Sequence, residues 1–100
     1  MRVIALSMFK AFWEVAPEYL DAKEQVLAWY RHRLHADWSS PADVKIDFRS
    51  ASILKDGRVV FNIAGNKYRL VVWINYSYRV VYIRFIGTHA QYDKIYVQTI

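Results

Sequence analysis

The fold is decided by residues 67–86, which read KYRLVVWINYSYRVVYIRFI. Every second residue from Tyr68 to Ile74 is apolar or aromatic, and side chains of a β-strand alternate between its two faces. The pattern breaks at residues 76–78 and resumes with a period of two from Arg79 to Ile86. We therefore predict two antiparallel strands, 67–75 and 79–86, with one face buried under other elements.

Further strands are expected on either side of this pair. Residues 59–64 lead into it through Gly65-Asn66, a pair typical of tight hairpins because both residues accept positive φ. A turn is expected at 55–58 and a loop at 37–43. Residues 44–49 alternate apolar and charged side chains, which predicts a half-buried strand, and Arg2–Leu6 is a short strand candidate. The sheet then has four or five strands.

Two amphipathic helices are expected before the sheet. Apolar residues recur at helical spacing from Met8 to Ala16, behind a candidate N-cap at Ser7, and Pro17 ends this helix. A second helix is expected over Glu18–His35. Its predicted apolar stripe, which includes one lysine and is widened by Val26, consists of Leu20, Lys23, Leu27, Tyr30 and Leu34. A helical hairpin on one face of a mainly antiparallel sheet is an α+β fold, in one domain over residues 1–100.

Composition narrows the class of protein. The 100 residues are 55% hydrophobic, which is enough to fold, and contain no cysteine, which excludes disulfide, thiolate-zinc and iron–sulfur chemistry. No apolar run approaches the about 20 residues that cross a bilayer, and no signal segment is recognised, so we expect a cytoplasmic protein without membrane contact. Residues 51–100 hold the whole net charge of +5, which favours a polyanionic partner.

The face of the sheet away from the helices is the candidate binding surface. Alternation places Lys67 and Arg69 side by side on it, and Tyr82 with Arg84 if the next strand keeps its period. Cations that contact phosphates and rings that stack on unpaired bases characterise nucleic-acid sites. The alternative is a solvated face whose charges only resist edge-to-edge association.

A second candidate feature follows the last strand. Gly87 is expected to let the chain leave the sheet, and Thr88 to cap one helical turn. In such a turn His89, Tyr92 and Asp93 lie on one side, near Lys67 and Arg69. His89 is therefore a candidate acid or base, whereas His32 and His35 are expected to be structural.

Several of these segments together resemble a known family. They are Phe61-Asn62-Ile63, Gly65 to Leu70, and Gly87-Thr88-His89 with Tyr92-Asp93, and the likeness covers nearly the whole chain. The sequence resembles the HigB toxins of the RelE-like superfamily. The resemblance implies the microbial ribonuclease-like fold and a cofactor-free endoribonuclease that cleaves mRNA, usually in the ribosomal A site. It also implies a helix-turn-helix antitoxin of the HigA type. The toxin is expected to associate with operator DNA only through this antitoxin.

The resemblance also implies roles for single residues. Arg69 resembles the strand arginine that faces the scissile phosphate, His89 lies near the position of a basic catalytic residue, and Tyr92 resembles the nearby aromatic one. The chain lacks the lysine-rich segment of the best-described RelE toxins, so the general base is left open.

We expect metal-independent catalysis in which Arg69, assisted by Lys67, stabilises the transition state. His89 is expected to act as acid or base, and Tyr92 to stack on a base or position the hydroxyl. The other expected RNA contacts are Arg84, Thr88 and Lys94.

Two other functions are compatible with the sequence. In the first, the basic face binds RNA or a protein without cutting. In the second, the chain is a structural interaction protein whose partner docks on the aromatic helices, with Trp13, Trp29 and Trp38 as candidate anchors. Core packing or loop anchoring is the expected use of these rings.

Overall fold

A five-stranded sheet organises the part of the chain that the computed structural model describes, which is residues 1–15, 17–34, 36–65, 67–97 and 100. The strands lie in the order β1-β5-β4-β3-β2. β1 pairs in parallel with β5 and the other neighbours are antiparallel, which confirms the prediction of a mainly antiparallel sheet. Their bounds are β1 Arg2–Ile4, β2 Ser52–Ile53, β3 Arg58–Ile63, β4 Tyr68–Asn75 and β5 Val80–Thr88.

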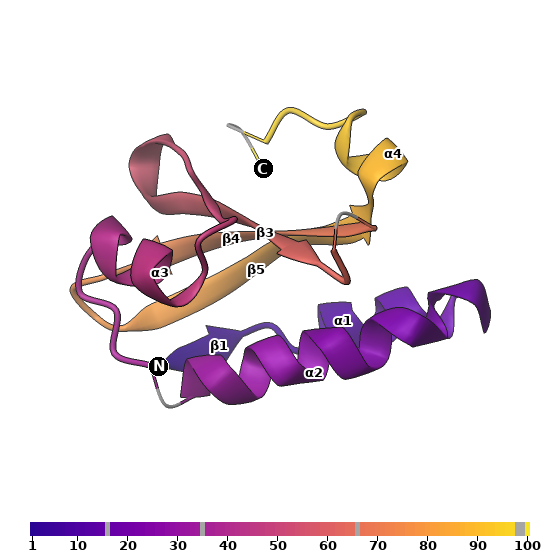
Figure 1. Ribbon diagram of the computed structural model, residues 1–100, viewed down its shortest axis with the longest axis horizontal. Helices are drawn as coiled ribbons and strands as arrows, with labels where there is room; N and C mark the ends of the chain where they lie inside the picture. The colour runs from indigo at the N-terminus through magenta and orange to yellow at the C-terminus, as the bar shows by residue number, and fades with distance from the viewer. Residues whose placement is uncertain (16, 35, 66, 98–99) are drawn as a thin grey trace.

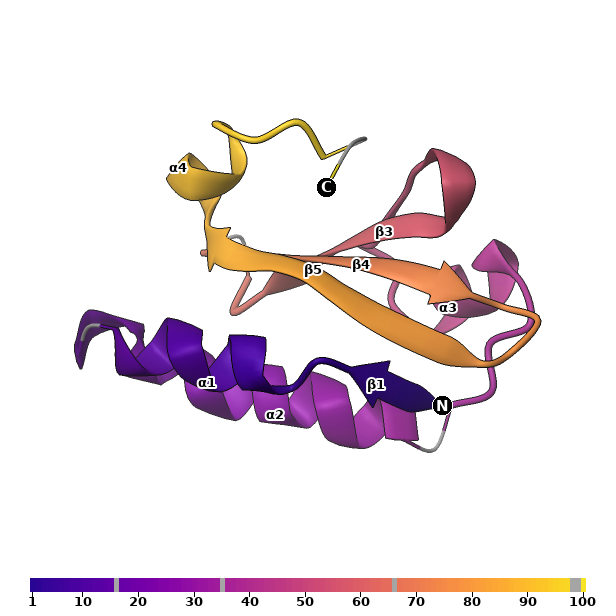
Figure 2. The ribbon, with the colours of Figure 1, turned by 180° about the vertical axis from the view of Figure 1, so that it is seen from behind.

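The helical hairpin covers one face of this sheet, which confirms the α+β prediction (Figure 1). α1 (Ser7–Glu14) and α2 (Leu20–Leu34) lie side by side, joined by a 3-10 turn, η1 (Pro17–Tyr19), that begins at the predicted helix breaker. Seen from behind, α4 (His89–Tyr92) and the C-terminal segment lie on the opposite side of the sheet (Figure 2). We call that opposite side the open face.

The buried core lies between the hairpin and the inner face of the sheet. The alternation of β4 holds, because Tyr68, Leu70, Val72 and Ile74 all belong to the core. The wider core contains further fully or nearly fully buried side chains from both layers: Phe9, Val26, Trp29, Trp38, Val44, Val59, Phe61 and Val81. Trp29 and Trp38 are 3% and 2% exposed, which confirms core packing for these two rings and excludes them as anchors of a partner; of the three candidates only Trp13 is partly exposed.

The buried side of α2 differs from the predicted stripe by about one residue. Ala22, Val26 and Trp29 are buried, whereas Leu20 is 54% exposed and Lys23 is exposed. The side of α2 that the sheet buries most deeply is thus the row of Ala22, Val26 and Trp29, while Leu27 and Tyr30 beside it are half-buried. Ser7 likewise is not the N-cap of α1; Leu6 occupies that position, with no side-chain cap.

The predicted strand at residues 44–49 is wrong, because residues 44–47 belong to α3 (Pro41–Asp47) and residues 48 and 49 follow its end. Ser40 is extended at its N-cap, Pro41 occupies the first turn, and the Asp43 carboxylate accepts hydrogen bonds from Ser39. Of the alternating apolar residues only Val44 is fully buried, while Ile46 is 75% exposed. The fifth strand is β2 instead, which pairs with β3 through Ser52 and Ile53.

The turns lie close to their predicted places. The 55–58 turn is a 3-10 turn, η2 (Lys55–Gly57). Gly65 adopts a φ of +67°, as a tight hairpin requires, whereas its predicted turn partner Asn66 lies outside the described residues, as do Ala16 and His35.

The open face is only partly exposed to solvent. Val60 and Val71 belong to this face by register, yet they are 3% and 0% exposed. The C-terminal segment lies on this side of the sheet (Figure 1), and Arg58 donates hydrogen bonds from Nε and Nη2 to the Ile100 carbonyl at 3.1 and 3.0 Å. The exposed part of the face therefore lies toward β4 and β5.

Candidate functional site

Arg69 is the centre of the candidate site. It is half-buried on the open face of β4, between Asn62 of β3 and Gly87 of β5 in the strand register. Its Nη1 donates a hydrogen bond to the Tyr68 carbonyl at 3.3 Å. These partners orient the guanidinium near the end of the sheet where β5 runs into α4.

The one-turn helix α4 is fastened to this end of the sheet. The Thr88 hydroxyl accepts a hydrogen bond from the Gln91 amide at 3.2 Å, and the Gln91 side chain accepts one from the Thr88 amide at 2.9 Å. This reciprocal capping box confirms Thr88 as the predicted cap. The His89 amide also donates to the Lys67 carbonyl at 3.3 Å, which links α4 to the residue preceding β4.

Gly87 has a different role from the predicted one. The strand continues through it to Thr88, so Gly87 does not release the chain from the sheet. A Cβ at this position would lie 2.6 Å from Gln91 Oε1 and 2.6 Å from Phe85 Cζ. The missing side chain opposite Arg69 therefore lets α4 and its capping glutamine lie close to the open face.

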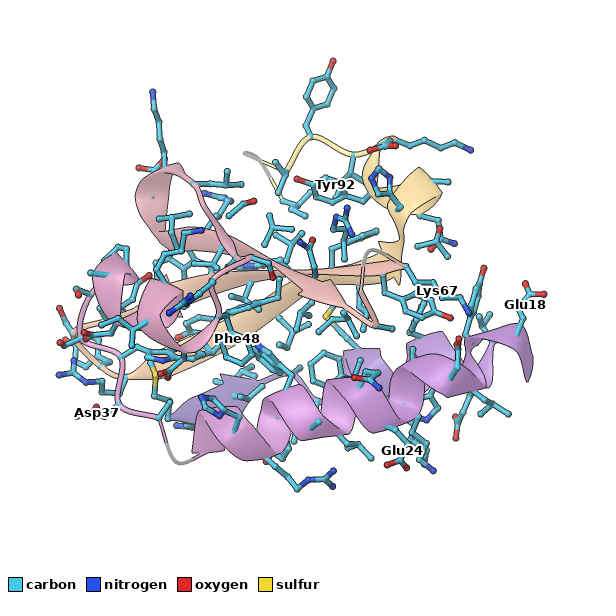
Figure 3. All side chains as sticks on the ribbon, in the orientation of Figure 1. Glu18, Glu24, Asp37, Phe48, Lys67 and Tyr92 are labelled. Carbon is cyan, nitrogen blue, oxygen red and sulfur yellow. The ribbon has the colours of Figure 1, made fainter. Side chains whose placement is uncertain are left out.

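His89 and Asp93 form a pair on α4. His89 Nδ1 lies 3.0 Å from Asp93 Oδ2, and the two side chains are 52% and 60% exposed. Tyr92 is half-buried and extends from α4 over the open face (Figure 3). The imidazole is accessible, at the same end of the sheet as Arg69, as the register of Arg69 with Gly87 requires.

Lys67 is not beside Arg69 on the open face, so that expectation is wrong. Its ammonium binds the Asp21 carboxylate of α2, which also accepts a hydrogen bond from the Tyr68 hydroxyl (Figure 3). Lys67 precedes β4 and lies in a turn, where strand alternation does not apply. Hydrogen bonds from Lys67 and then Tyr68 lower the pKa of Asp21 below its ordinary value, and the bond to Asp21 raises the pKa of Lys67.

A β-bulge alters the predicted face of the last strand. Val71 pairs with Phe85 and Val72 with Ile83, so Arg84 is an extra residue without a partner in the register. Tyr82 lies on the open face as predicted, paired with Trp73. Arg84 is exposed at the bulge, its guanidinium carbon 5.7 Å from the centroid of the Tyr82 ring. Lys94 is exposed in the turn after α4.

His32 has the structural surroundings expected of it. Its Nε2 lies 3.2 Å from Asp47 Oδ2, and its ring packs edge-on against Phe48. The same carboxylate accepts a hydrogen bond from the Trp38 indole at 2.8 Å. Bonds from Trp38 and then His32 lower the pKa of Asp47. His32 thus helps to join α2 to α3.

Alternation along β4 also places Trp73 on the open face, but sequence reasoning missed two cross-strand pairings of the predicted site residues. Asn62 lies opposite Arg69, and Trp73 lies opposite Tyr82. Both depend on strand register, which periodicity within one strand does not determine. Among the described residues, no group of three or more histidine, cysteine or acidic side chains is placed to hold a metal ion, and no helix is long and apolar enough to cross a membrane.

The sequence of this chain is similar to those of known proteins. The HigB_toxin family, described as the RelE-like toxic component of a toxin-antitoxin system, matches residues 22–95, which include Arg69, α4 and most of the sheet. The chain belongs to the HigB toxin family. The relatives of this HigB chain include the mRNA interferase toxin HigB of Escherichia coli K12, 30% identical over 84% of this chain and 83% of the relative. The mRNA interferase HigB of Escherichia coli O6:H1 (strain CFT073) is 26% identical over 95% of this chain and 91% of its own length.

Membership of the HigB family identifies one kind of partner for this chain. A toxic component of a toxin-antitoxin system has an antitoxin as its partner. In this HigB chain an arginine of β4 and the histidine and tyrosine of α4 lie at the same end of the sheet.

Proposed function

We propose that this HigB chain is an endoribonuclease that cleaves messenger RNA, with its active site at the Arg69 end of the open face. Arg69 of β4 and His89 of α4 are brought to one sheet end by the pairing of Arg69 with Gly87. That juxtaposition carries the proposal, and the relatives named mRNA interferases support it. No cofactor takes part in the proposed reaction.

RNA supplies its own nucleophile in the proposed reaction. A base removes the proton of the 2′-hydroxyl, the 2′-oxygen bonds to the adjacent phosphorus, and the bond to the 5′-oxygen breaks. An acid protonates the departing 5′-oxygen, so the products are a 2′,3′-cyclic phosphate and a 5′-hydroxyl. Arg69 stabilises the charge that develops on the phosphorane oxygens, because a guanidinium matches phosphate geometry.

His89 is the proposed acid or base. Its Nδ1 lies 3.0 Å from the Asp93 carboxylate, which can accept the Nδ1 proton and leaves Nε2 as the atom that exchanges a proton with the substrate. Asp93 is therefore a positioning residue in this scheme. Tyr92, which extends over the open face, stacks on a base or orients the hydroxyl.

The remaining predicted RNA contacts take more limited roles. The Thr88 hydroxyl accepts the capping bond from Gln91 and still has its own hydrogen to donate to a phosphate oxygen. Arg84 and Lys94 are exposed and attract the phosphate backbone. Lys67 is engaged by Asp21, so the proposal leaves it outside the transition-state site.

Cleavage of a defined message by the purified toxin tests this site. We expect His89→Ala to slow cleavage by about 10²–10⁴-fold, the usual contribution of one acid or base, with the fold intact. His32→Ala is the matched control, because His32 is about equally exposed but lies on α2 beside Asp47. Full cleavage by His89→Ala removes His89 from the mechanism.

Arg69→Ala separates catalysis from recognition of the antitoxin. We expect loss of toxicity and of cleavage, with antitoxin binding preserved. An unfolded or antitoxin-blind variant would place Arg69 in a structural role.

We also propose that the message is cut in the ribosomal A site and that the antitoxin is a helix-turn-helix protein of the HigA type, which alone contacts operator DNA. Cleavage with and without ribosomes tests the first point, and co-purification of the toxin with the product of the adjacent reading frame tests the second. A non-catalytic RNA- or protein-binding module is excluded if new 5′ ends appear in the message and disappear with His89→Ala.

A further inference from the structure

Two aromatic rings lie together on the exposed part of the open face. Trp73 of β4 and Tyr82 of β5 are paired in the strand register, with ring centroids 5.1 Å apart and planes inclined by 36°. Neither ring belongs to the core beneath the helices, and both are partly exposed. The pair therefore presents aromatic surface to solvent on the same face as Arg69.

The Trp73 indole is held in place by the neighbouring turn. Its Nε1 donates a hydrogen bond to the Asp56 carbonyl of η2. Asp56 adopts a φ of +60° and Gly57 one of +83°, backbone conformations that side chains disfavour. A Cβ at Gly57 would lie 2.8 Å from the Ile74 carbonyl oxygen and 3.0 Å from Trp73 Nε1. The turn is thus shaped to contact the edge of this ring, which fixes the ring before any ligand arrives.

Arg84 extends the aromatic pair toward the solvent. The bulge places it outside the strand register, and its guanidinium carbon lies 5.7 Å from the Tyr82 centroid. A cation over a ring and a second ring beside it form a continuous strip across β4 and β5. No acidic residue occurs in β3, β4 or β5, whereas Arg58, Arg69 and Arg84 do, so the face favours a polyanion.

We propose that Trp73, Tyr82 and Arg84 form a stacking subsite for an unpaired base of single-stranded RNA, next to the cleaved bond. The proposal rests on the proposed function for its substrate. Trp73 lies four residues beyond Arg69 on the same face, about 13 Å at the usual rise per residue. An RNA strand held at Arg69 by its phosphate thus reaches the rings with a base about two nucleotides along an extended strand. Stacking on rings is tolerant of sequence and strong enough to hold a strand.

Binding of a fully 2′-O-methylated RNA oligonucleotide tests the subsite, because such RNA lacks the 2′-hydroxyl needed for cleavage. We expect Tyr82→Leu and Trp73→Leu each to weaken binding by about tenfold, within the range for loss of one stacked base. Tyr82→Phe keeps the ring and is expected to restore most of the affinity. Tyr78→Leu is the matched control, because Tyr78 is 80% exposed in the adjoining turn and lies outside the strip.

Arg84→Gln tests the same subsite even if the ring variants unfold. Arg84 is an exposed side chain at a bulge, so its replacement leaves the core intact. We expect weaker RNA binding and a salt dependence reduced by about one phosphate contact. Unchanged affinity and unchanged salt dependence in Arg84→Gln, together with unchanged affinity in any folded ring variant, overturn the subsite.

The outcomes distinguish this proposal from the proposed function. If the wild-type toxin cleaves message and folded Tyr82→Leu binds RNA like the wild type, the subsite alone is wrong. If the wild type does not cleave, but Tyr82→Leu still loses RNA affinity, the subsite stands and the enzyme assignment fails. If Tyr82→Leu keeps RNA affinity but escapes neutralisation by the antitoxin, the strip is a protein-binding surface, which also overturns the proposal.

Discussion

Lys67 and Arg69 lie two positions apart in the chain, yet their side chains lie on opposite sides of the sheet. Arg69 obeys strand alternation because β4 already includes it, and its neighbours on both sides are paired strands. Lys67 lies in the preceding turn, and the carboxylate of Asp21 attracts it toward α2. The prediction for Arg69 therefore holds and that for Lys67 fails, because alternation applies only to residues inside a ladder.

Gly87 offers a test at the scale of a single residue. Gly87→Ala places a methyl group against Gln91 Oε1 and the Phe85 ring, so the capping box must shift. We expect a loss of stability of about 1 kcal/mol, typical of a lost cap, and slower RNA cleavage because His89 moves with α4. Urea unfolding and message cleavage measure the two effects.

The control for Gly87→Ala is the same change in a Gln91→Ala background. Removing the Gln91 side chain relieves half of the crowding, so the stability cost of Gly87→Ala should be smaller there. Strictly additive costs would show that the two residues do not interact.

The helix α3 shows why a short element is hard to predict. Residues 44–49 alternate in polarity, as a strand would. A segment this short fits a helix equally well, however, and the seven residues of α3 make two helical turns. The signals at Ser40, Pro41 and Asp43 favour a helix start, and they lie before the stretch whose alternation predicted a strand. What decides the outcome is burial of Val44 and the contact of Asp47 with Trp38 and His32.

Asp47 joins α3 to the core, and its removal gives a prediction at the scale of elements. Asp47→Ala leaves the buried Trp38 indole without its acceptor, so we expect a loss of about 1–3 kcal/mol in the free energy of unfolding. Asp47→Asn keeps an acceptor oxygen and should cost less. Urea unfolding of both, beside the exposed Glu24→Ala control on α2, provides the measurement. Equal stability of Asp47→Ala and wild type would refute the role of this bond.

At the scale of the molecule, the helical hairpin and the sheet are joined by polar contacts as well as by the core. Asp21 of α2 binds Lys67 and Tyr68 at the end of the sheet where Arg69 and α4 lie. At the other end of α2, His32 contacts Asp47. Both carboxylates have lowered pKa values, Asp21 chiefly through Lys67 and Asp47 chiefly through Trp38.

These lowered pKa values predict a sensitivity of the whole fold to acid. A carboxyl whose pKa is lower in the folded state stabilises it above the unfolded pKa of about 3.8, and this stability is lost as the pH falls through the folded pKa. We expect the free energy of unfolding to decrease with pH below about 4, and to decrease less steeply in Asp21→Asn. Urea unfolding at pH 7, 5, 4 and 3, chosen to bracket that value, measures the slopes. Identical slopes would contradict the contribution of Asp21.

The sequence by itself determined the antiparallel meander, the helical hairpin, the helix cap at Thr88 and the family resemblance. The first three depend on residues within a few positions of one another, because strand alternation, helical spacing and capping are local, whereas the resemblance depends on several motifs along the chain. Only the tertiary structure decided the helix at 41–47, the bulge at Arg84, the pairing of Lys67 with Asp21 and the meeting of Trp73 with Tyr82. These features depend on which distant segments pack together, and the local pattern of residues does not determine that packing.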